Sequence, residues 1–250
     1  MSGHIPVLLD ECIKYLNIKP DGVYVDGTLG MGGHSEAIAK LLTTGRLISI
    51  DRDAYAIERA GERLAPYADR VTIVRGNFRD LGAILDEQGV GLVDGMLFDL
   101  GVSSPQLDEG GRGFSYMVDA PLDMRMDKSD NIDAWFIVNR WPEEKIFRIL
   151  RDYGEERHAS RIAKAIAARR EEKEIKTTAE LVELIKSAMP AAALREKQHP
   201  AKRSFQAIRI AVNDELGAVS ELMENAPDRL KPGGRLAVIS FHSLEDRIGK

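Results

Sequence analysis

A glycine-rich turn between a predicted strand and a predicted helix constrains the fold of this chain most. Residues 22–26, Gly-Val-Tyr-Val-Asp, form a β-branched and aromatic run that predicts a strand, and residues 27–33, Gly-Thr-Leu-Gly-Met-Gly-Gly, follow it directly. Apolar residues at helical spacing predict a helix over residues 34–42. A strand, a glycine turn and a helix in this order are typical of an open α/β sheet, in which ligands bind at the carboxyl ends of the strands.

The alternation of strands and helices continues through the first hundred residues. Further strands are predicted at 46–50, 71–74 and 93–98, and helices between them over residues 53–67 and 81–88. These strands are almost continuously apolar, as expected when helices cover both faces of a parallel sheet. The predicted fold class is therefore α/β, a Rossmann-like, mostly parallel sheet.

The pattern changes after Gly101. Residues 103–126, rich in Gly, Ser, Pro and Asp, predict a long loop, whereas residues 132–189 have helical periodicity and include an amphipathic segment at 159–170. A capping box, Thr177-Thr-Ala-Glu180, predicts a helix that runs through Ala188. Another helix is predicted from about residue 204 towards residue 223. A turn at 230–235 then leads into a fifth strand at 236–240.

These segments predict an inserted domain. We expect a first part of the sheet domain over residues 1–103, a mostly helical insertion over residues 104–204, and a second part of the sheet domain over residues 205–250.

Composition excludes several classes of protein. A chain of 250 residues that is 44% hydrophobic, with a formal net charge of −5, has too much apolar content for a disordered chain. The single cysteine, Cys12, excludes a disulfide scaffold and fits a reducing compartment. The N-terminus lacks the features of a signal peptide, and no apolar run approaches the roughly 20 residues that span a bilayer. We expect a cytoplasmic protein with no membrane partner.

The glycine turn does not complete the dinucleotide fingerprint, because Ser35 stands where that motif needs a third Gly or Ala. Instead an acid, Asp26, precedes the glycines. An acid beside exposed backbone amides suits a ligand that carries both a cation and a carboxylate. This arrangement resembles the first motif of S-adenosylmethionine (SAM) methyltransferases. The alternative interpretation is an ordinary strand-to-helix turn.

Three further residues follow predicted strands at the same edge of the sheet. Asp51 comes close to the spacing of about 20 residues at which an acid accepts hydrogen bonds from the ribose of NAD or of SAM. Phe78 is a candidate to pack on an adenine ring, and Asp99 lies where a methyltransferase holds the group nearest the transferred methyl. Helix capping, core packing and loop capping are the respective structural alternatives.

Longer motifs then occur in a specific order: Asp26-Gly-Thr-Leu-Gly-Met-Gly-Gly-His-Ser35, Asp51-Arg-Asp53, Phe98-Asp-Leu-Gly-Val-Ser-Ser-Pro-Gln-Leu-Asp108, Arg112-Gly-Phe-Ser115, Pro121-Leu-Asp-Met-Arg-Met126, Tyr153-Gly-Glu-Glu-Arg157 and Ser240-Phe-His-Ser-Leu-Glu-Asp-Arg247. From about His4 to Lys250 the chain resembles the RsmH (MraW) family. Members of that family methylate N4 of a cytidine, position 1402, in the decoding region of bacterial 16S rRNA. The resemblance implies a class I SAM-dependent fold, and 16S rRNA within the 30S subunit as the partner.

The resemblance also assigns residues to the cofactor. By position in the motifs it places Gly32, Gly33 and His34 at the cofactor's first loop and Asp51 at the ribose. It places Phe78 near the adenine, and Asp99 and Gln106 in the cofactor pocket. No metal site is predicted, because the five histidines have no ligand spacing. Family chains continue beyond the Ser240–Arg247 motif, so we expect the last strands of the sheet to be missing from this sequence.

The catalytic group is left open between two candidates, Asp99 and His242. Many exocyclic-amine methyltransferases carry Asn/Asp-Pro-Pro-aromatic after the fourth strand, and this chain has Asp99-Leu-Gly-Val instead. Ser240 and His242 follow the fifth strand at the same edge of the sheet, where they are expected to help hold the base. A paired cytosine would first have to leave its stack.

Any contact with RNA is expected to be made by a local basic segment, because the chain as a whole is acidic. Residues 195–209 carry five basic residues and one acid, which predicts phosphate contacts by Lys202 and Arg203, although a solvated helix face is the commoner meaning of such a run. A second basic run, residues 157–170, is followed at once by Glu171, Glu172 and Glu174. A nicotinamide dehydrogenase and a non-catalytic RNA-binding protein remain as alternatives, and the oligomeric state is left open.

Overall fold

The computed structural model describes residues 6–102 and 110–250. The chain forms two compact units. The first comprises Met1–Gly101 with Leu216–Lys250, and the second comprises Val102–Glu215. The domain limits predicted at 103/104 and 204/205 stay a prediction.

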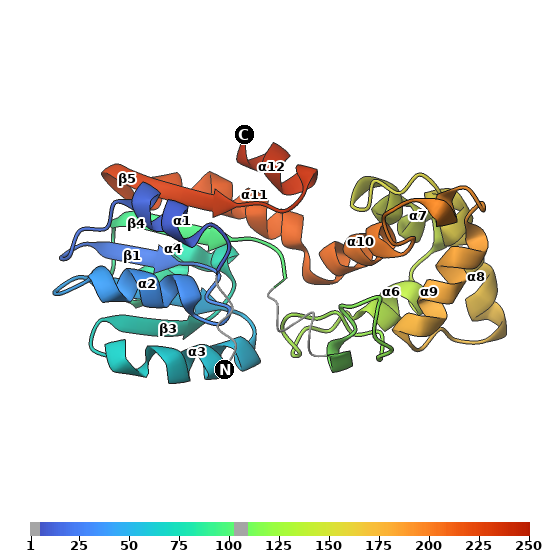
Figure 1. Ribbon diagram of the computed structural model, residues 1–250, viewed down its shortest axis with the longest axis horizontal. Helices are drawn as coiled ribbons and strands as arrows, with labels where there is room; N and C mark the ends of the chain where they lie inside the picture. The colour runs from blue at the N-terminus through green and yellow to red at the C-terminus, as the bar shows by residue number, and fades with distance from the viewer. Residues whose placement is uncertain (1–5, 103–109) are drawn as a thin grey trace. The chain divides into compact units, whose positions relative to one another are not determined.

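The first unit is built on a parallel sheet that has five strands among the described residues (Figure 1). The strands are β1 (Val23–Asp26), β2 (Arg46–Asp51), β3 (Val71–Arg75), β4 (Val93–Asp99) and β5 (Leu230–Ile239), in the order β3-β2-β1-β4-β5. The order reverses at β1, whose neighbours are β2 and β4. This topology confirms the predicted Rossmann-like α/β fold and places the switch point beside the glycine turn.

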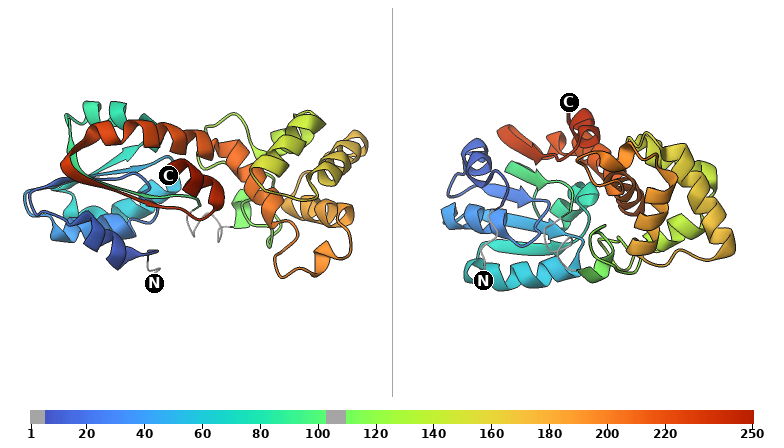
Figure 2. Two further views of the ribbon diagram at one scale, coloured as in Figure 1. Left: turned by 90° about the horizontal axis from the view of Figure 1, so that it is seen from above. Right: turned by 45° about the vertical axis from the view of Figure 1, so that its right-hand side comes forward.

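Helices cover both faces of this sheet. On one face lie α1 (Leu9–Leu16), α2 (Gly33–Leu41) and α3 (Ala54–Leu64), and on the other lie α4 (Leu81–Glu87) and α11 (Glu215–Asn225) (Figures 1 and 2). Leu97 packs with α1 and α2, whereas its neighbour Phe98 packs with α4 and α11. Because successive side chains of a strand point to opposite faces, both faces bury apolar residues. The short helices η1 (Ala65–Tyr67), η2 (Phe78–Asp80), η5 (Pro227–Arg229) and α12 (Ser243–Gly249) complete this unit.

The second unit is mostly helical. Its helices are η3 (Gly110–Arg112), α6 (Ala134–Arg140), α7 (Glu143–Asp152), α8 (Ala159–Glu172), α9 (Thr178–Ala188), η4 (Ala193–Arg195) and α10 (Lys202–Asn213). Fully buried residues such as Ile137, Leu150, Ile162 and Ile208 form one apolar core with the loop at 114–126. The predicted capping box is present, because Thr177 accepts a hydrogen bond from the Glu180 amide and the Glu180 carboxylate accepts one from the Thr177 amide.

Two predicted elements differ from the observed ones, and one observed helix was not predicted. A single helix predicted from 204 towards 223 is wrong, because Asp214 adopts a left-handed conformation (φ 47°) and separates α10 from α11. The turn predicted at 230–235 lies inside β5. The pairing of β5 with β4 shifts register there, from Leu230 opposite Val93 to Arg235 opposite Gly95. The intervening residues are accommodated as an irregularity in the strand, with Gly233 at φ 78°. Helix α1 was not predicted at all.

None of the helices in residues 6–102 and 110–250 is long and apolar enough to cross a bilayer.

Candidate functional site

The glycine turn is held tightly between β1 and α2. A Cβ atom on Gly27 would lie 2.0 Å from the ring of Phe98, so only glycine fits where the turn leaves β1. Gly32 has φ 76°, a conformation that glycine adopts without strain, and it stands at the N-terminus of α2. The backbone amides at this end of α2 therefore lie beside the carboxyl edge of the sheet.

Asp26 organises the turn from inside the protein. Its carboxylate is fully buried and accepts hydrogen bonds from the Thr28 amide (3.1 Å) and the Ser35 hydroxyl (2.6 Å). The Ser35 hydroxyl also lies 2.7 Å from that of Ser49 on β2. Burial raises the pKa of Asp26. Because no part of the side chain is exposed, Asp26 shapes the turn and cannot contact a ligand.

Asp51 ends β2 and is bonded to the same turn. One carboxylate oxygen accepts a hydrogen bond from the Gly30 amide (2.8 Å), and the other accepts one from the Asp53 amide (2.9 Å). The side chain is half-buried, and burial raises its pKa to about 6. Each carboxylate oxygen retains a second lone pair for a ligand hydroxyl. Asp53 fills the capping role predicted for it, since its side chain accepts a hydrogen bond from the Tyr55 amide at the start of α3.

Asp99 ends β4, on the other side of β1. Its backbone amide donates to the Thr28 hydroxyl (2.6 Å), so the glycine turn holds this strand end too. The side chain is 26% exposed, and one carboxylate oxygen lies 3.9 Å from Nδ1 of His34. The turn thus brings two carboxylates, those of Asp51 and Asp99, to the strand ends that flank β1.

His34 lies in the first turn of α2 and is buried, with 5% of its surface exposed. Its Nε2 atom is 3.0 Å from the backbone carbonyl oxygen of Val7. A carbonyl oxygen can only accept a hydrogen bond, so Nε2 carries the proton and Nδ1 presents a lone pair when the ring is neutral.

Phe78 lies beside the same edge of the sheet. It follows β3 at the start of η2, is half-buried, and packs edge-to-face on Phe98 with ring centroids 5.8 Å apart. Since Phe98 in turn contacts Gly27, Phe78 belongs to the packing around the turn. Gln106, which the resemblance assigns to the cofactor pocket, lies outside the described residues.

Ser240 and His242 follow β5, whose last residue, Ile239, is paired with Asp99. Ser240 is exposed. His242 is engaged with α12, because its Nδ1 caps the Glu245 amide (3.5 Å) and its Nε2 lies 3.2 Å from the buried Glu245 carboxylate. Both ring nitrogens of His242 therefore face Glu245.

The basic segment at 195–209 belongs to the second unit. Arg195, Lys197 and Lys202 are exposed, whereas Arg203 is half-buried and donates to the Glu155 carbonyl (3.0 Å). Arg209 forms a bidentate ion pair with the buried carboxylate of Glu215, at 2.8 and 2.9 Å. The cationic surface of this segment is therefore smaller than its sequence indicates.

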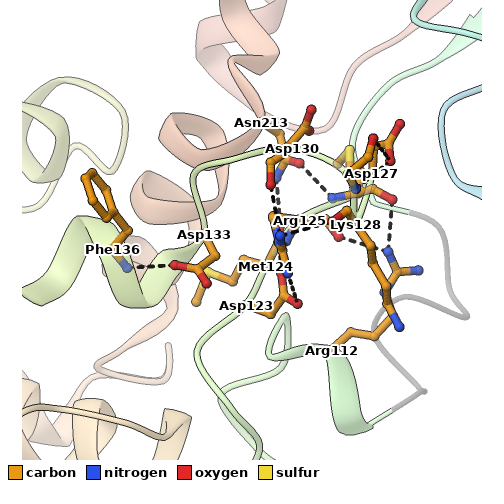
Figure 3. Close-up of polar contacts among 12 residues, drawn as sticks. Arg112, Asp123, Met124, Arg125, Asp127, Lys128, Asp130, Asp133, Phe136 and Asn213 are labelled. Atoms are coloured by element: carbon orange, nitrogen blue, oxygen red, sulfur yellow. Dashed lines mark hydrogen bonds and ion pairs between the residues drawn. The ribbon is translucent and has the colours of Figure 1, made fainter.

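The Arg112 and Pro121–Met126 motifs form a polar cluster in the second unit (Figure 3). Arg112 donates to the carbonyls of Arg125 and Met126, and the Arg125 guanidinium pairs with Asp123. Asn213 accepts from the Met126 amide and donates to the Met124 carbonyl, each at 2.8 Å. These bonds fix a loop in which buried Met124 has φ 62°.

Sequence reasoning missed two residues that shape the site, Thr28 and Ser35. Thr28 joins the turn to β4, and Ser35 joins α2 to buried Asp26. The Asp26-Gly-Thr28 spacing could have indicated the local bond from the Thr28 amide to the Asp26 carboxylate, because Asp commonly accepts from the residue two positions on. The bond from the Asp99 amide to Thr28 spans 71 residues and leaves no local signal.

The residues at this edge fit S-adenosylmethionine. The cofactor carries a ribose diol, a carboxylate and an ammonium group. Asp51 offers acceptor oxygens for the hydroxyls, and the N-terminus of α2 offers amides for the carboxylate. Within the described part of the chain, no group of three or more His, Cys, Asp or Glu residues could hold a metal ion.

Comparison with known proteins identifies the family of the chain. A sequence model of the MraW methylase family matches residues 1–250. The chain is 58% identical, over 99% of its length and 79% of the relative's, to a ribosomal RNA small subunit methyltransferase H from Brevibacillus brevis. It is 57% identical, over 99% of its length and 78% of the relative's, to the protein of the same name from Symbiobacterium thermophilum.

Proposed function

The chain belongs to the MraW methylase family and has the class I methyltransferase fold, and on this premise we propose that it methylates N4 of cytidine 1402 in 16S rRNA of the small ribosomal subunit. The methyl donor is S-adenosylmethionine, and the substrate is the rRNA within the 30S subunit. The cytoplasmic location predicted from the sequence goes with this proposal.

One observation carries the proposal: Asp51 and Asp99 stand on the two strands that flank β1, each bonded to the glycine turn. Asp51 is bonded through the Gly30 amide and Asp99 through the Thr28 hydroxyl. The turn therefore holds Asp51, proposed to accept from the ribose, and Asp99, proposed to lie near the methyl group, at fixed positions relative to each other. Preorganised groups of this kind cost no rearrangement during the reaction.

Bound S-adenosylmethionine would supply the methyl group. In this proposal Asp51 accepts from the ribose, the amides of Gly32, Gly33 and His34 face the carboxylate, and Phe78 packs near the adenine. Gln106 is assigned to the cofactor pocket through the family resemblance alone. These contacts would hold the methyl group near Asp99, and positioning of this kind contributes up to roughly 7–11 kcal/mol to catalysis in well-oriented systems.

Asp99 is the better of the two catalytic candidates. The N4 lone pair of cytosine is delocalised into the ring, so the amine reacts only if an acceptor draws on an N–H as the new bond forms. Asp99 has a side chain that is 26% exposed and can reach the amine. His242 is only 12% exposed and both of its ring nitrogens face Glu245, which supports a structural role in α12. Exposed Ser240, next to the residue paired with Asp99, is the candidate to hold the base.

Methyl transfer to 30S subunits tests this function. Unmodified 30S subunits are incubated with the protein and methyl-labelled S-adenosylmethionine, and the 16S rRNA is then digested to nucleosides for mass spectrometry. We expect label in N4-methylcytidine and its loss when a DNA oligonucleotide masks the decoding region. Label in another nucleoside would refute the N4 assignment, and absence of transfer would favour a non-catalytic RNA-binding protein.

Cofactor affinity is expected to depend on the ionisation of Asp51. Its pKa of about 6 in the free protein lies above the ordinary range because of burial. Ribose hydroxyls donate to the ionised carboxylate, so binding favours that form and lowers the pKa. Affinity should therefore rise as the pH increases through about 6, with proton release in that range. Asp51→Ala should weaken binding about 100-fold, since two hydrogen bonds to a charged group are lost.

Calorimetry with S-adenosylhomocysteine measures this dependence without any turnover. Asp51→Asn keeps the size of the side chain but cannot ionise, so the rise in affinity through about pH 6 should be lost. Asp69→Asn removes an exposed carboxylate on the same unit and should retain the wild-type profile. A rise of wild-type size through about pH 6 in Asp51→Asn would contradict the assignment of Asp51 to the ribose.

RNA binding is expected to weaken with salt, and Lys202 to contribute to that dependence. A lysine that contacts one phosphate adds about one to the slope of log affinity against log salt concentration. Lys202→Ala should lower the slope by about that amount. The double variant Lys202→Ala/Arg203→Ala should lower the slope further. The additional decrease should be less than about one, because Arg203 already donates to the Glu155 carbonyl. Lys173→Ala, which removes a cation paired with Glu180, is the control. Equal slopes in all variants would exclude this segment from the RNA interface.

A further inference from the structure

His34 has a hydrogen-bonding arrangement that cofactor binding does not explain. Its Nε2–H donates to the Val7 carbonyl, which leaves the lone pair of Nδ1 as the only other polar group of the ring. That nitrogen lies 3.9 Å from a carboxylate oxygen of Asp99. A neutral imidazole nitrogen and a carboxylate oxygen are both hydrogen-bond acceptors. They can form a hydrogen bond with each other only when one of them is protonated.

A proton on Nδ1 changes this balance. The ring then becomes an imidazolium whose new N–H lies near an anion, and a hydrogen bond between charged groups is stronger than one between neutral groups. The distance of 3.9 Å is too long for a hydrogen bond, but catalytic contacts in proteins without ligand are often long and tighten in the reacting complex.

The proposed reaction supplies such a proton. Methylation of an exocyclic amine forms one N–C bond and breaks one S–C bond, whose electron pair stays on sulfur. The nitrogen, transiently cationic, must lose one proton. Asp99 is 26% exposed and His34 only 6%, so the amine meets Asp99 first and His34 lies behind it.

We propose that Asp99 and His34 form a proton-accepting pair: Asp99 accepts the hydrogen bond from the amine, and Nδ1 of His34 holds the proton that the amine releases. This inference rests on the proposed function, since it needs an amine as the methyl acceptor. His34 acts through Asp99 and is therefore a positioning residue with a proton-storing role.

Other titratable groups around the pair do not take this role. Asp26, on β1, is fully buried and bonded to Thr28 and Ser35. Cys12, on α1, has its pKa raised to about 11 by burial, with the charges of Asp99, Glu11 and Asp26 adding to the effect. A thiol with such a pKa is protonated near neutral pH and cannot accept another proton.

His34→Gln separates the proton role from the structural one. The amide nitrogen of glutamine can replace Nε2–H as the donor to Val7, but the variant has no nitrogen that takes up a proton. With saturating cofactor and 30S subunits, the single-turnover rate of the wild type should rise with pH through one apparent pKa. The variant should be about 100-fold slower and lack that rise. His158→Gln, a histidine of the second unit, is the control and should keep the wild-type profile.

Nuclear magnetic resonance of the free protein gives a second readout. With 15N-labelled histidine, the His34 signals are those absent from His34→Gln. We expect the Nε2–H tautomer at pH 8, because Nε2 faces the Val7 carbonyl. An Nδ1–H tautomer at pH 8 would overturn the proposal. So would a folded His34→Gln protein with the wild-type rate and pH profile. Failure of the wild type to methylate 30S subunits would instead refute the proposed function.

Discussion

Asp99→Ala is expected to slow methyl transfer to 30S subunits by at least about 1,000-fold, which corresponds to roughly 4 kcal/mol of transition-state stabilisation. The variant removes the acceptor for the amine N–H and the anion near the transferred methyl group in one step. The fold should survive, because the strand end is held by the Asp99 backbone amide, which donates to Thr28 whatever the side chain is. Single-turnover rates at saturating cofactor measure the chemical step apart from cofactor affinity.

Two further variants sharpen this experiment. Asp99→Asn keeps the shape and one acceptor oxygen but lacks the charge, so its rate should lie between those of Asp99→Ala and the wild type. Asp228→Asn removes an exposed carboxylate from the same unit and should change the rate less than twofold. Near-normal turnover by Asp99→Ala, with a wild-type thermal unfolding curve, would eliminate Asp99 as the acceptor and return attention to His242.

The sheet and its carboxyl edge could be predicted because their signals are local. The first four strands, β1 to β4, are short apolar runs. A polar residue stands at the end of each of them. In a parallel sheet the carboxyl ends of the strands meet at one edge, so Asp51 and Asp99 could be expected there together. Asp53 could be predicted as a cap because an acid directly before a helical pattern satisfies free amides.

The elements and site residues that could not be predicted from the sequence depend on contacts between distant residues. Helix α1 spans eight residues between Leu8 and Asn17, both in the left-handed conformation and neither of them glycine, so no sequence signal marks its ends. Its burial against the sheet through Cys12 and Leu16 determines it. The break at Asp214 could not be predicted either, since the neighbouring Asn213 is held by bonds to Met124 and Met126, which lie 89 and 87 positions away. Only family resemblance pointed to His34, because its partners Val7 and Asp99 lie 27 and 65 positions away.

The second large effect is expected from Asn213→Ala, in the polar cluster of the second unit. This buried side chain accepts a hydrogen bond from the Met126 amide and donates to the carbonyls of Met124 and Arg209, at 2.8 to 2.9 Å. Truncation leaves these backbone groups without their partner and frees a loop that contains a left-handed residue, Met124. The free energy of unfolding of this unit should fall by about 3–4 kcal/mol.

Tryptophan fluorescence can assign this loss to the second unit. Both tryptophans of the chain, Trp135 and Trp141, belong to that unit, so a urea titration followed by their emission reports its unfolding. Ser187→Ala removes an exposed hydroxyl of the same unit that also donates to a helical carbonyl, and it should cost less than about 0.5 kcal/mol. Asn213→Asp keeps the volume and the acceptor but loses both donors, so it should also destabilise strongly. If Asn213→Asp is as stable as the wild type, packing rather than hydrogen bonding holds this loop in place.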